Sequence, residues 1–205
     1  MNILAIGAHP DDIEIGCGGT LLKYARAGHK VYLFVLSYGS FGGDPNVRRV
    51  EQLKAVKAMG AKDIFWGNLI DTEIVNNREL IIKMDEVIRK VRPEVVLLNY
   101  HKDVHQDHRA ASLAGISATR YIKEVLFFEV PTTHHFEPDV FVDIQDVLEK
   151  KLRLLRIHAS QVEKTRVKNQ TILESARSCA NFRGFQGRVK YAEGFMALRM
   201  IREIK

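Results

Sequence analysis

The chain has 205 residues, 46% of them hydrophobic and 27% charged, and a formal charge of +6. We expect one soluble globular domain over residues 1–205, because this length and composition are typical of a domain with its own core. No apolar stretch approaches the ~20 residues of a membrane span, and the first residues already read as a core strand, so we expect neither a span nor a secretory leader. Two cysteines are too few for a disulfide framework, which predicts a cytoplasmic protein.

The basic excess lies mostly in 150–168 and 177–205, which read as an amphipathic helix and a tail. An excess of positive charge is compatible with binding to nucleic acid, to an acidic membrane surface or to an anionic small substrate. A solvated basic face is the favoured interpretation, and we expect no nucleic-acid partner. The sequence leaves a homo-oligomer open.

Apolar strands and helices alternate along the chain. The predicted strands cover 2–7, 31–36, 63–66, 95–98, 125–129 and 141–144. The predicted helices cover 17–28, 46–59, 80–91, 107–123 and 147–158, and 183–187 is predicted to be a Gly-bearing turn. This order predicts an α/β, Rossmann-like fold with a mostly parallel sheet and helices on both faces. Ligands of such sheets bind beyond the carboxyl ends of the strands.

Two polar segments follow predicted strands at that edge. The first is AHPDD at 8–12, and the second is DVHQDHR at 103–109. A buried charge without a partner costs several kcal/mol, so charged residues at strand ends imply a metal or another partner. The glycines at 16–19 do not have the GxGxxG spacing of a dinucleotide loop, and two carboxylates precede them, which is wrong for phosphates. Those glycines are expected to let a helix start pack closely under the site.

The histidines and carboxylates of these segments have the spacing of metal ligands. His9 and Asp12 are three residues apart, as are His105 and His108, so each pair can face one side. Two histidines and one carboxylate leave an open coordination position, as in a catalytic zinc site. Spacing does not decide which of His105 and His108 binds the metal, and the other would stabilise the oxyanion. We expect one Zn²⁺, although such a site also accepts other divalent metals.

The remaining carboxylates have other predicted roles. Asp11 neighbours a ligand in sequence and must point elsewhere, which makes it the candidate general base. Asp103 and Asp107 are candidates to accept hydrogen bonds from the ligand rings. The alternative is that Asp11 and Asp12 only cap a helix and the histidines lie on the surface. Two such segments at strand exits favour the metal site.

The two segments resemble the signature motifs of the PIG-L-type (LmbE-like) N-acetylglucosaminyl deacetylase family. Further resemblance lies in Arg48 with Glu51, in Asp143, in Lys151 and in the run HASQ at 158–161. The resemblance implies that His9, Asp12 and His108 are the zinc ligands. It implies that Asp11 is the general base and that His105 stabilises the oxyanion. Arg48 and Asp71 would contact the substrate. The resemblance also implies hydrolysis of the N-acetyl amide of an amino sugar or glycoconjugate, releasing acetate and a free amine.

Some positions depart from that family's pattern. Ser40 stands where the family usually has an acidic residue that reaches the substrate, and Thr72 follows Asp71 where Gly is frequent. These departures leave the sugar, the aglycone and the acyl group open. His134 and His135 are candidates to line the mouth of the site. Two alternatives remain: a metal-dependent hydrolase of another bond, such as a phosphoester, and a sugar- or nucleotide-binding module without turnover, which would have no need of a base at Asp11.

Overall fold

The computed structural model describes residues 1–201, and within them seven strands form one sheet in the order β3-β2-β1-β4-β5-β7-β6. The strands are β1 (Asn2–Gly7), β2 (Lys30–Ser37), β3 (Asp63–Leu69), β4 (Val95–Asn99), β5 (Glu124–Phe128), β6 (Val140–Asp143) and β7 (Ala192–Arg199). Strands β1 to β5 pair in parallel, and β7 runs antiparallel to both β5 and β6.

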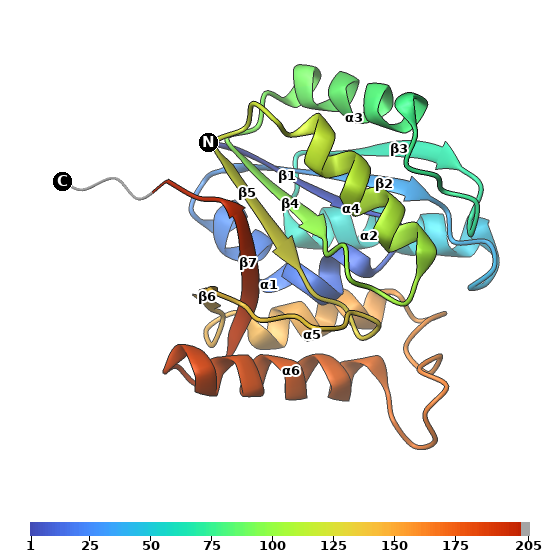
Figure 1. Ribbon diagram of the computed structural model, residues 1–205. Helices are drawn as coiled ribbons and strands as arrows, with labels where there is room; N and C mark the ends of the chain where they lie inside the picture. Colours follow the sequence, from blue (N-terminus) through green and yellow to red (C-terminus); the bar gives the residue numbers. More distant parts are fainter. Residues whose placement is uncertain (202–205) are drawn as a thin grey trace.

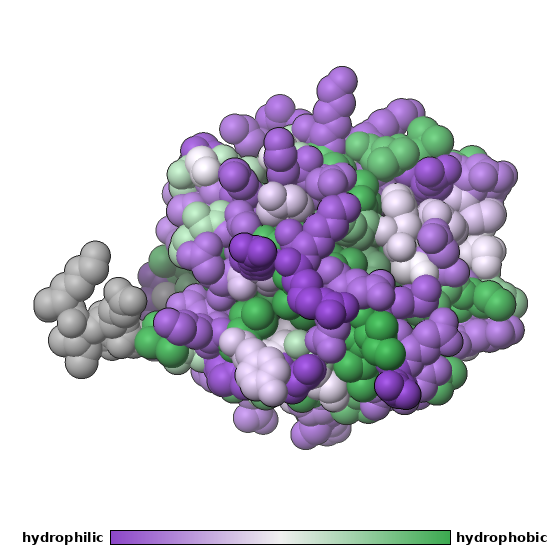
Figure 2. Space-filling model, turned by 90° about the horizontal axis from the view of Figure 1, so that it is seen from above, coloured by the Kyte–Doolittle hydropathy of each residue, from purple (hydrophilic) through white to green (hydrophobic). Residues whose placement is uncertain are grey.

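Six helices cover both faces of the sheet (Figure 1). They are α1 (Asp12–Arg26), α2 (Pro45–Met59), α3 (Arg78–Val91), α4 (Gln106–Ala118), α5 (Leu148–Ile157) and α6 (Ile172–Gly187). The first, second, fifth and sixth enclose one apolar core with the sheet, and α3 and α4 enclose the other. The surface seen from above, on the side of α3 and α4, is mostly hydrophilic with apolar side chains scattered over it (Figure 2). The predicted α/β fold with a mostly parallel sheet and helices on both faces is confirmed.

The strand order places the two polar segments side by side. Strand β1 lies in the middle of the sheet between β2 and β4. The chain leaves β1 toward β2 and β3 and then returns to the other side for β4 and β5, so the strand order reverses between β1 and β4. A crevice forms at the carboxyl ends of strands where the order reverses, and ligands bind there. The loops that carry AHPDD and DVHQDHR leave these two strands.

The C-terminal third differs from the prediction. The predicted turn at 183–187 is wrong, because these residues are the end of helix α6. That helix begins with a capping box, in which the Thr171 side chain accepts from the Glu174 amide and the Glu174 carboxylate accepts from the Thr171 amide. The predicted basic tail contains β7, which inserts between β5 and β6. Its strand pattern is weak because Gly194 interrupts it.

Two helix boundaries also differ. Helix α1 begins at Asp12 and not at Cys17. Helix α4 ends at Ala118, where the Thr119 hydroxyl donates to the Gly115 carbonyl over 2.7 Å, so the predicted end at 123 is too late. In the part of the chain from 1 to 201, the helices are too short or too polar for a membrane span. Cys17 and Cys179 are both free thiols.

Candidate metal centre

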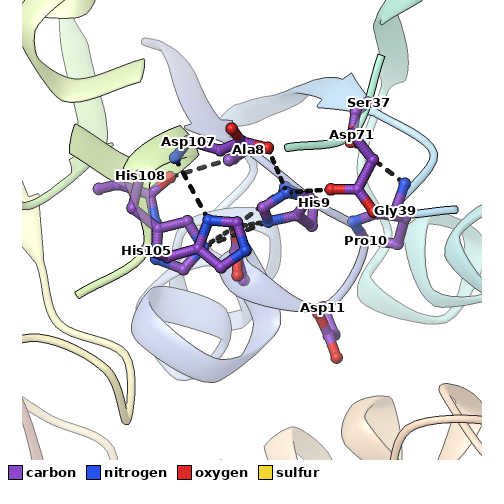
Figure 3. A network of polar contacts seen from close by, with 12 residues as sticks. Ala8, His9, Pro10, Asp11, Ser37, Gly39, Asp71, His105, Asp107 and His108 are labelled. Atoms are coloured by element: carbon purple, nitrogen blue, oxygen red, sulfur yellow. Dashed lines mark hydrogen bonds and ion pairs between the residues drawn. The ribbon is translucent and has the colours of Figure 1, made fainter. Parts of the chain in front are cut away.

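The two polar segments meet at the carboxyl ends of β1 and β4 (Figure 3). His9 and Asp11 lie in the loop after β1, and Asp12 is the first residue of α1. His105 caps the N-terminus of α4, and His108 lies in the first turn of that helix. The N-termini of α1 and α4 and the loop after β1 therefore bring these side chains together.

Three side-chain atoms have the mutual distances of metal ligands. His9 Nδ1 lies 3.2 Å from His108 Nε2 and 3.6 Å from Asp12 Oδ2. His108 Nε2 lies 3.2 Å from the same Asp12 oxygen. Ligands of a tetrahedral zinc ion, each about 2.0–2.1 Å from the metal, lie about 3.3 Å apart. The donor set therefore fits one divalent ion, and all three residues are buried.

Each of the two histidine rings has a carboxylate beside the nitrogen that faces away from the three candidate ligand atoms. His9 Nε2 lies 2.9 Å from Asp71 Oδ1 and 3.0 Å from Asp107 Oδ2, and His108 Nδ1 lies 3.2 Å from Asp103 Oδ1. An ionised carboxylate only accepts, so these ring nitrogens carry the protons. In the neutral rings His9 Nδ1 and His108 Nε2 then present lone pairs to a metal.

These outer carboxylates are held by the backbone. Asp107 accepts from the amides of Thr72 and Ile74, over 2.7 and 3.3 Å, and Asp71 accepts from the Phe41 amide over 2.7 Å. His9, Asp71 and Asp107 are also close enough together to form a metal-binding group. Because the backbone amides and the His9 ring already occupy those carboxylates, we interpret them as partners of the ring.

The electrostatics of the cluster favour a cation. Asp12, Asp71, Asp103 and Asp107 surround two imidazoles, and all are buried. Burial raises the pKa of Asp71, but the hydrogen bond and charge of His9 outweigh it and lower this pKa to about 2. Burial lowers the pKa of His108, yet Asp12 and Asp103 raise it to about 9. Four carboxylates around two neutral histidines leave negative charge, part of which a divalent ion would offset.

Asp11 stands apart from the ligand set, as Figure 3 shows. Its φ of 87° is in the left-handed region, which non-glycine residues adopt at a cost of about 1–3 kcal/mol. Its amide donates to Gln52 Oε1 over 3.2 Å, and its carboxylate lies 3.4 Å from Arg48 Nη2. Burial raises the pKa of Asp11 to about 6, although the Arg48 charge acts in the opposite direction. Strained backbone at a polar strand exit is typical of functional sites.

Arg48 connects the Asp11 loop with the loop after β2. Its guanidinium is buried and donates to the Gly39 carbonyl over 2.7 Å and to the Pro10 carbonyl over 2.8 Å. Gly39 has a φ of 66°, and a Cβ there would lie 2.0 Å from Arg48 Nη1. The backbone conformation and the guanidinium both require glycine at this position.

His105 lies against the rings of both His9 and His108. Its ring centroid is 4.7 Å from that of His9 and 4.8 Å from that of His108. Its Nδ1 accepts from the Asp107 amide over 3.2 Å, so in the neutral ring Nε2 carries the proton. Burial and the charges of His9 and His108 lower the pKa of His105, which favours this neutral form.

A second polar layer lies behind Asp11. Glu51 and the HASQ run at 158–161 belong to the family resemblance of the sequence, whereas Gln52 and Glu14 were not singled out there. Gln52, which holds the Asp11 amide, donates to Glu14 Oε1 over 2.6 Å. His158 Nε2 lies 3.6 Å from Glu14 Oε2. Glu51 accepts from the amide and the hydroxyl of Ser160, over 2.8 and 2.6 Å. The HASQ run was a usable signal, since it brings His158 and Ser160 against this layer.

The other predicted residues lie farther out. His134 and His135 are exposed on the loop after β5, where the His134 amide donates to the Lys102 carbonyl over 2.9 Å. Ser40 is exposed on the loop after β2. Thr132, on the same loop as His134, was not predicted, and its hydroxyl lies 3.5 Å from His108 Nδ1. No sequence spacing indicates this contact.

Known proteins share both the sequence and the shape of this chain. The chain is 34% identical to the uncharacterised deacetylase YaiS of Escherichia coli (strain K12), over 77% of this chain and 90% of that protein. It is 35% identical to diacetylchitobiose deacetylase of Thermococcus kodakarensis, over 78% of this chain and 69% of that protein. The solved N,N'-diacetylchitobiose deacetylase of Pyrococcus horikoshii superposes with a TM-score of 0.86 at 27% identity, covering 96% of this chain and 83% of that one.

Residues 4–119 match the family model PIG-L, described as GlcNAc-PI de-N-acetylase. The match spans more than half of the chain and contains both polar segments, AHPDD at 8–12 and DVHQDHR at 103–109. The sequence, the fold and the position of the site at the β1–β4 crevice agree with this match. The chain belongs to the PIG-L family.

Proposed function

We propose that this protein is a zinc-dependent deacetylase, which hydrolyses the N-acetyl amide of an amino sugar or glycoconjugate. The observation that carries the proposal is the set of His9 Nδ1, Asp12 Oδ2 and His108 Nε2 at 3.2–3.6 Å from one another. Family membership and relatives named as deacetylases of N-acetylated sugars support the substrate class. Zinc is the proposed ion because two histidines and one carboxylate with an open position are typical of catalytic zinc.

A bound divalent ion lowers the pKa of water and polarises the acyl carbonyl. In the proposed reaction, Asp11 accepts the proton of the attacking water and passes it to the departing nitrogen. His105 donates from Nε2 to the oxyanion of the tetrahedral intermediate, because its Nδ1 is occupied by the Asp107 amide. The products are acetate and a free amine.

Arg48 and Asp71 remain predicted substrate contacts. Their present hydrogen bonds support a second role for each. Arg48 ties Pro10 and Asp11 to the loop that contains Gly39, and Asp71 orients the His9 ring. Asp103 supports His108 in the same way that Asp107 supports His9, by accepting from the ring nitrogen that faces away from the ligand set.

The decisive experiment follows acetate and free amine released from a small panel of N-acetylglucosamine conjugates. The protein is assayed after metal removal and again after one equivalent of Zn²⁺ is restored. We expect turnover of at least one conjugate only with metal, and the preferred conjugate identifies the aglycone. If the protein binds zinc stoichiometrically and hydrolyses no conjugate, the acyl-sugar class is wrong. A panel of phosphoesters then tests the alternative, a metal-dependent hydrolase of another bond.

A further inference from the structure

Helix α1 is broken at Cys17, directly after the turn that carries Asp12. Cys17 has φ −141° and ψ 16°, values outside the helical region. In an unbroken α-helix the Gly19 amide would donate to the Ile15 carbonyl. Here the Ile15 carbonyl accepts from Lys151 Nζ over 2.7 Å, and the Gly19 amide donates to Glu193 Oε1 over 2.8 Å. Two side chains from distant parts of the chain replace one helical hydrogen bond.

The two replacing groups form a buried ion pair. Lys151 Nζ lies 2.6 Å from Glu193 Oε1, and the two side chains are only 4% and 3% exposed. Glu193 Oε2 also accepts from the Thr20 amide over 2.7 Å and from its hydroxyl over 2.6 Å. The carboxylate therefore caps the start of the second helical segment, and the ammonium caps the end of the first. Both charges match the partial charges of these helix ends.

Because of the break, residues 12–16 form a short helical segment, and its axis need not continue the axis of the rest of α1. A Cβ at Gly16 would lie 2.1 Å from the ring of Phe128, so this segment packs directly on β5. Asp12 is its first residue and places one oxygen within 3.2–3.6 Å of the two histidine nitrogens. Straightening α1 would restore the Ile15–Gly19 hydrogen bond and rotate Asp12 away from its present place. A buried ion pair stabilises a fold little relative to apolar packing, so its main effect here is on geometry.

We propose that Lys151 and Glu193 are positioning residues, which hold the break in α1 and thereby keep Asp12 in place among the metal ligands. This inference rests on the proposed metal centre. Lys151 lies on α5 and Glu193 on β7, both outside residues 4–119 that match the family model. The C-terminal third thus completes the ligand geometry of a site whose own residues all lie in the first 108.

The test measures the metal site directly, with Co²⁺ as the probe. Cobalt replaces zinc in such donor sets, and its visible absorption reports the coordination geometry. Lys151→Met and Glu193→Gln remove one charge each and nearly keep the side-chain size. Leu152→Ala is the matched control, because Leu152 is a buried neighbour of Lys151 on α5 whose apolar side chain cannot donate or accept a hydrogen bond at the break in α1. Affinity is measured by chelator competition, and unfolding midpoints are recorded for every variant.

We expect both charge variants to bind Co²⁺ at least about tenfold more weakly than the unchanged protein and to show an altered absorption spectrum. Leu152→Ala is expected to lower the unfolding midpoint while keeping the affinity and spectrum. Should Lys151→Met or Glu193→Gln not fold, Glu193→Asp serves instead. The Asp side chain keeps the charge but is one methylene too short to reach both Gly19 and Thr20, so this variant should show the same change in the Co²⁺ spectrum. Lys151→Arg also keeps the charge and should change the Co²⁺ spectrum less.

Two results would overturn the inference, and they differ in meaning. If the unchanged protein binds Co²⁺ and the charge variants bind it with the same affinity and spectrum, the ion pair supports only the fold. If the unchanged protein binds no Co²⁺ and no Zn²⁺, the metal centre itself is wrong, and the positioning role fails with it.

Discussion

His9 Nε2 and Asp107 Oδ2 lie 3.0 Å apart, across 98 positions of sequence. This contact joins the loop after β1 to the first turn of α4, and it turns His9 Nδ1 toward Asp12 and His108. The adjacency of β1 and β4 brings the two segments together, but the carboxylate decides which ring nitrogen is presented. Asp71 Oδ1 lies 2.9 Å from the same ring nitrogen, so two carboxylates together hold the His9 ring in this orientation.

Asp107→Asn is expected to weaken zinc binding by about tenfold to a hundredfold, because the amide holds the His9 proton less strongly than a carboxylate does. Chelator competition measures the change. Asp85→Asn is the control, since Asp85 on α3 pairs with Arg120, which follows the C-terminal end of α4, the end opposite His105 and His108. Equal zinc affinity in Asp107→Asn and the unchanged protein would show that Asp107 does not orient the ligand.

Asp11→Asn separates metal binding from proton transfer. We expect it to keep one zinc and to lower kcat by about 10²–10⁴-fold, since the amide cannot accept the proton of water. Metal content and kcat are measured on the same preparation. Full turnover with metal bound would place the general base elsewhere and leave the Asp11 carboxylate only its contact with Arg48, since it makes no capping hydrogen bond to α1.

The two histidines of the second segment are expected to differ. His108→Ala should lose zinc, because it removes one of three ligands and leaves Asp103 without its ring partner. His105→Ala should keep zinc and lose about 10²–10³-fold in kcat, as expected for one oxyanion donor. His29→Ala is the control for removing a histidine, because His29 precedes β2 and contacts the amino group of Met1, at the opposite end of the strands from the site. The reverse pattern would exchange the two roles.

Much of the fold and of the site could be predicted because the information is local. The strands at 2–7 and 95–98 are continuous apolar runs, and a polar segment follows each one, so parallel-sheet geometry alone brings the segments to one edge. The choice between His105 and His108 could not be made from spacing. It depends on which ring nitrogen the Asp107 amide and the Asp103 carboxylate occupy, and those contacts appear only in three dimensions.

The C-terminal third is less predictable for a physical reason. Strand β7 is antiparallel and lies between β5 and β6, so its pairing partners are far away in sequence and its own pattern includes Gly194. The Lys151–Glu193 pair requires β7 in its place in the sheet, and its two side chains contact helix α1 at positions 136 and 174 residues earlier in the chain. No local motif indicates either feature.

Two neighbouring glycines of α1 give a matched test of how closely this helix must pack. A Cβ at Gly16 would lie 2.1 Å from the Phe128 ring, whereas a Cβ at Gly18 would meet Glu14 and Lys151 carbons at 3.7 and 3.8 Å and the Ile13 carbonyl oxygen at 4.0 Å, all ordinary contact distances. Gly16→Ala should therefore lower the free energy of unfolding by about 1–3 kcal/mol, the usual cost of overpacking a core. Gly18→Ala should be neutral or stabilising by up to about 1 kcal/mol, because alanine favours the helix.

Urea unfolding midpoints measure both changes, and zinc affinity is measured on the same variants. Because residues 12–16 carry Asp12, Gly16→Ala is expected to weaken zinc binding as well, while Gly18→Ala keeps it. Equal midpoints for the two variants would mean that α1 moves away from β5 at little cost, and the close packing of the helix start would then not be needed to place Asp12.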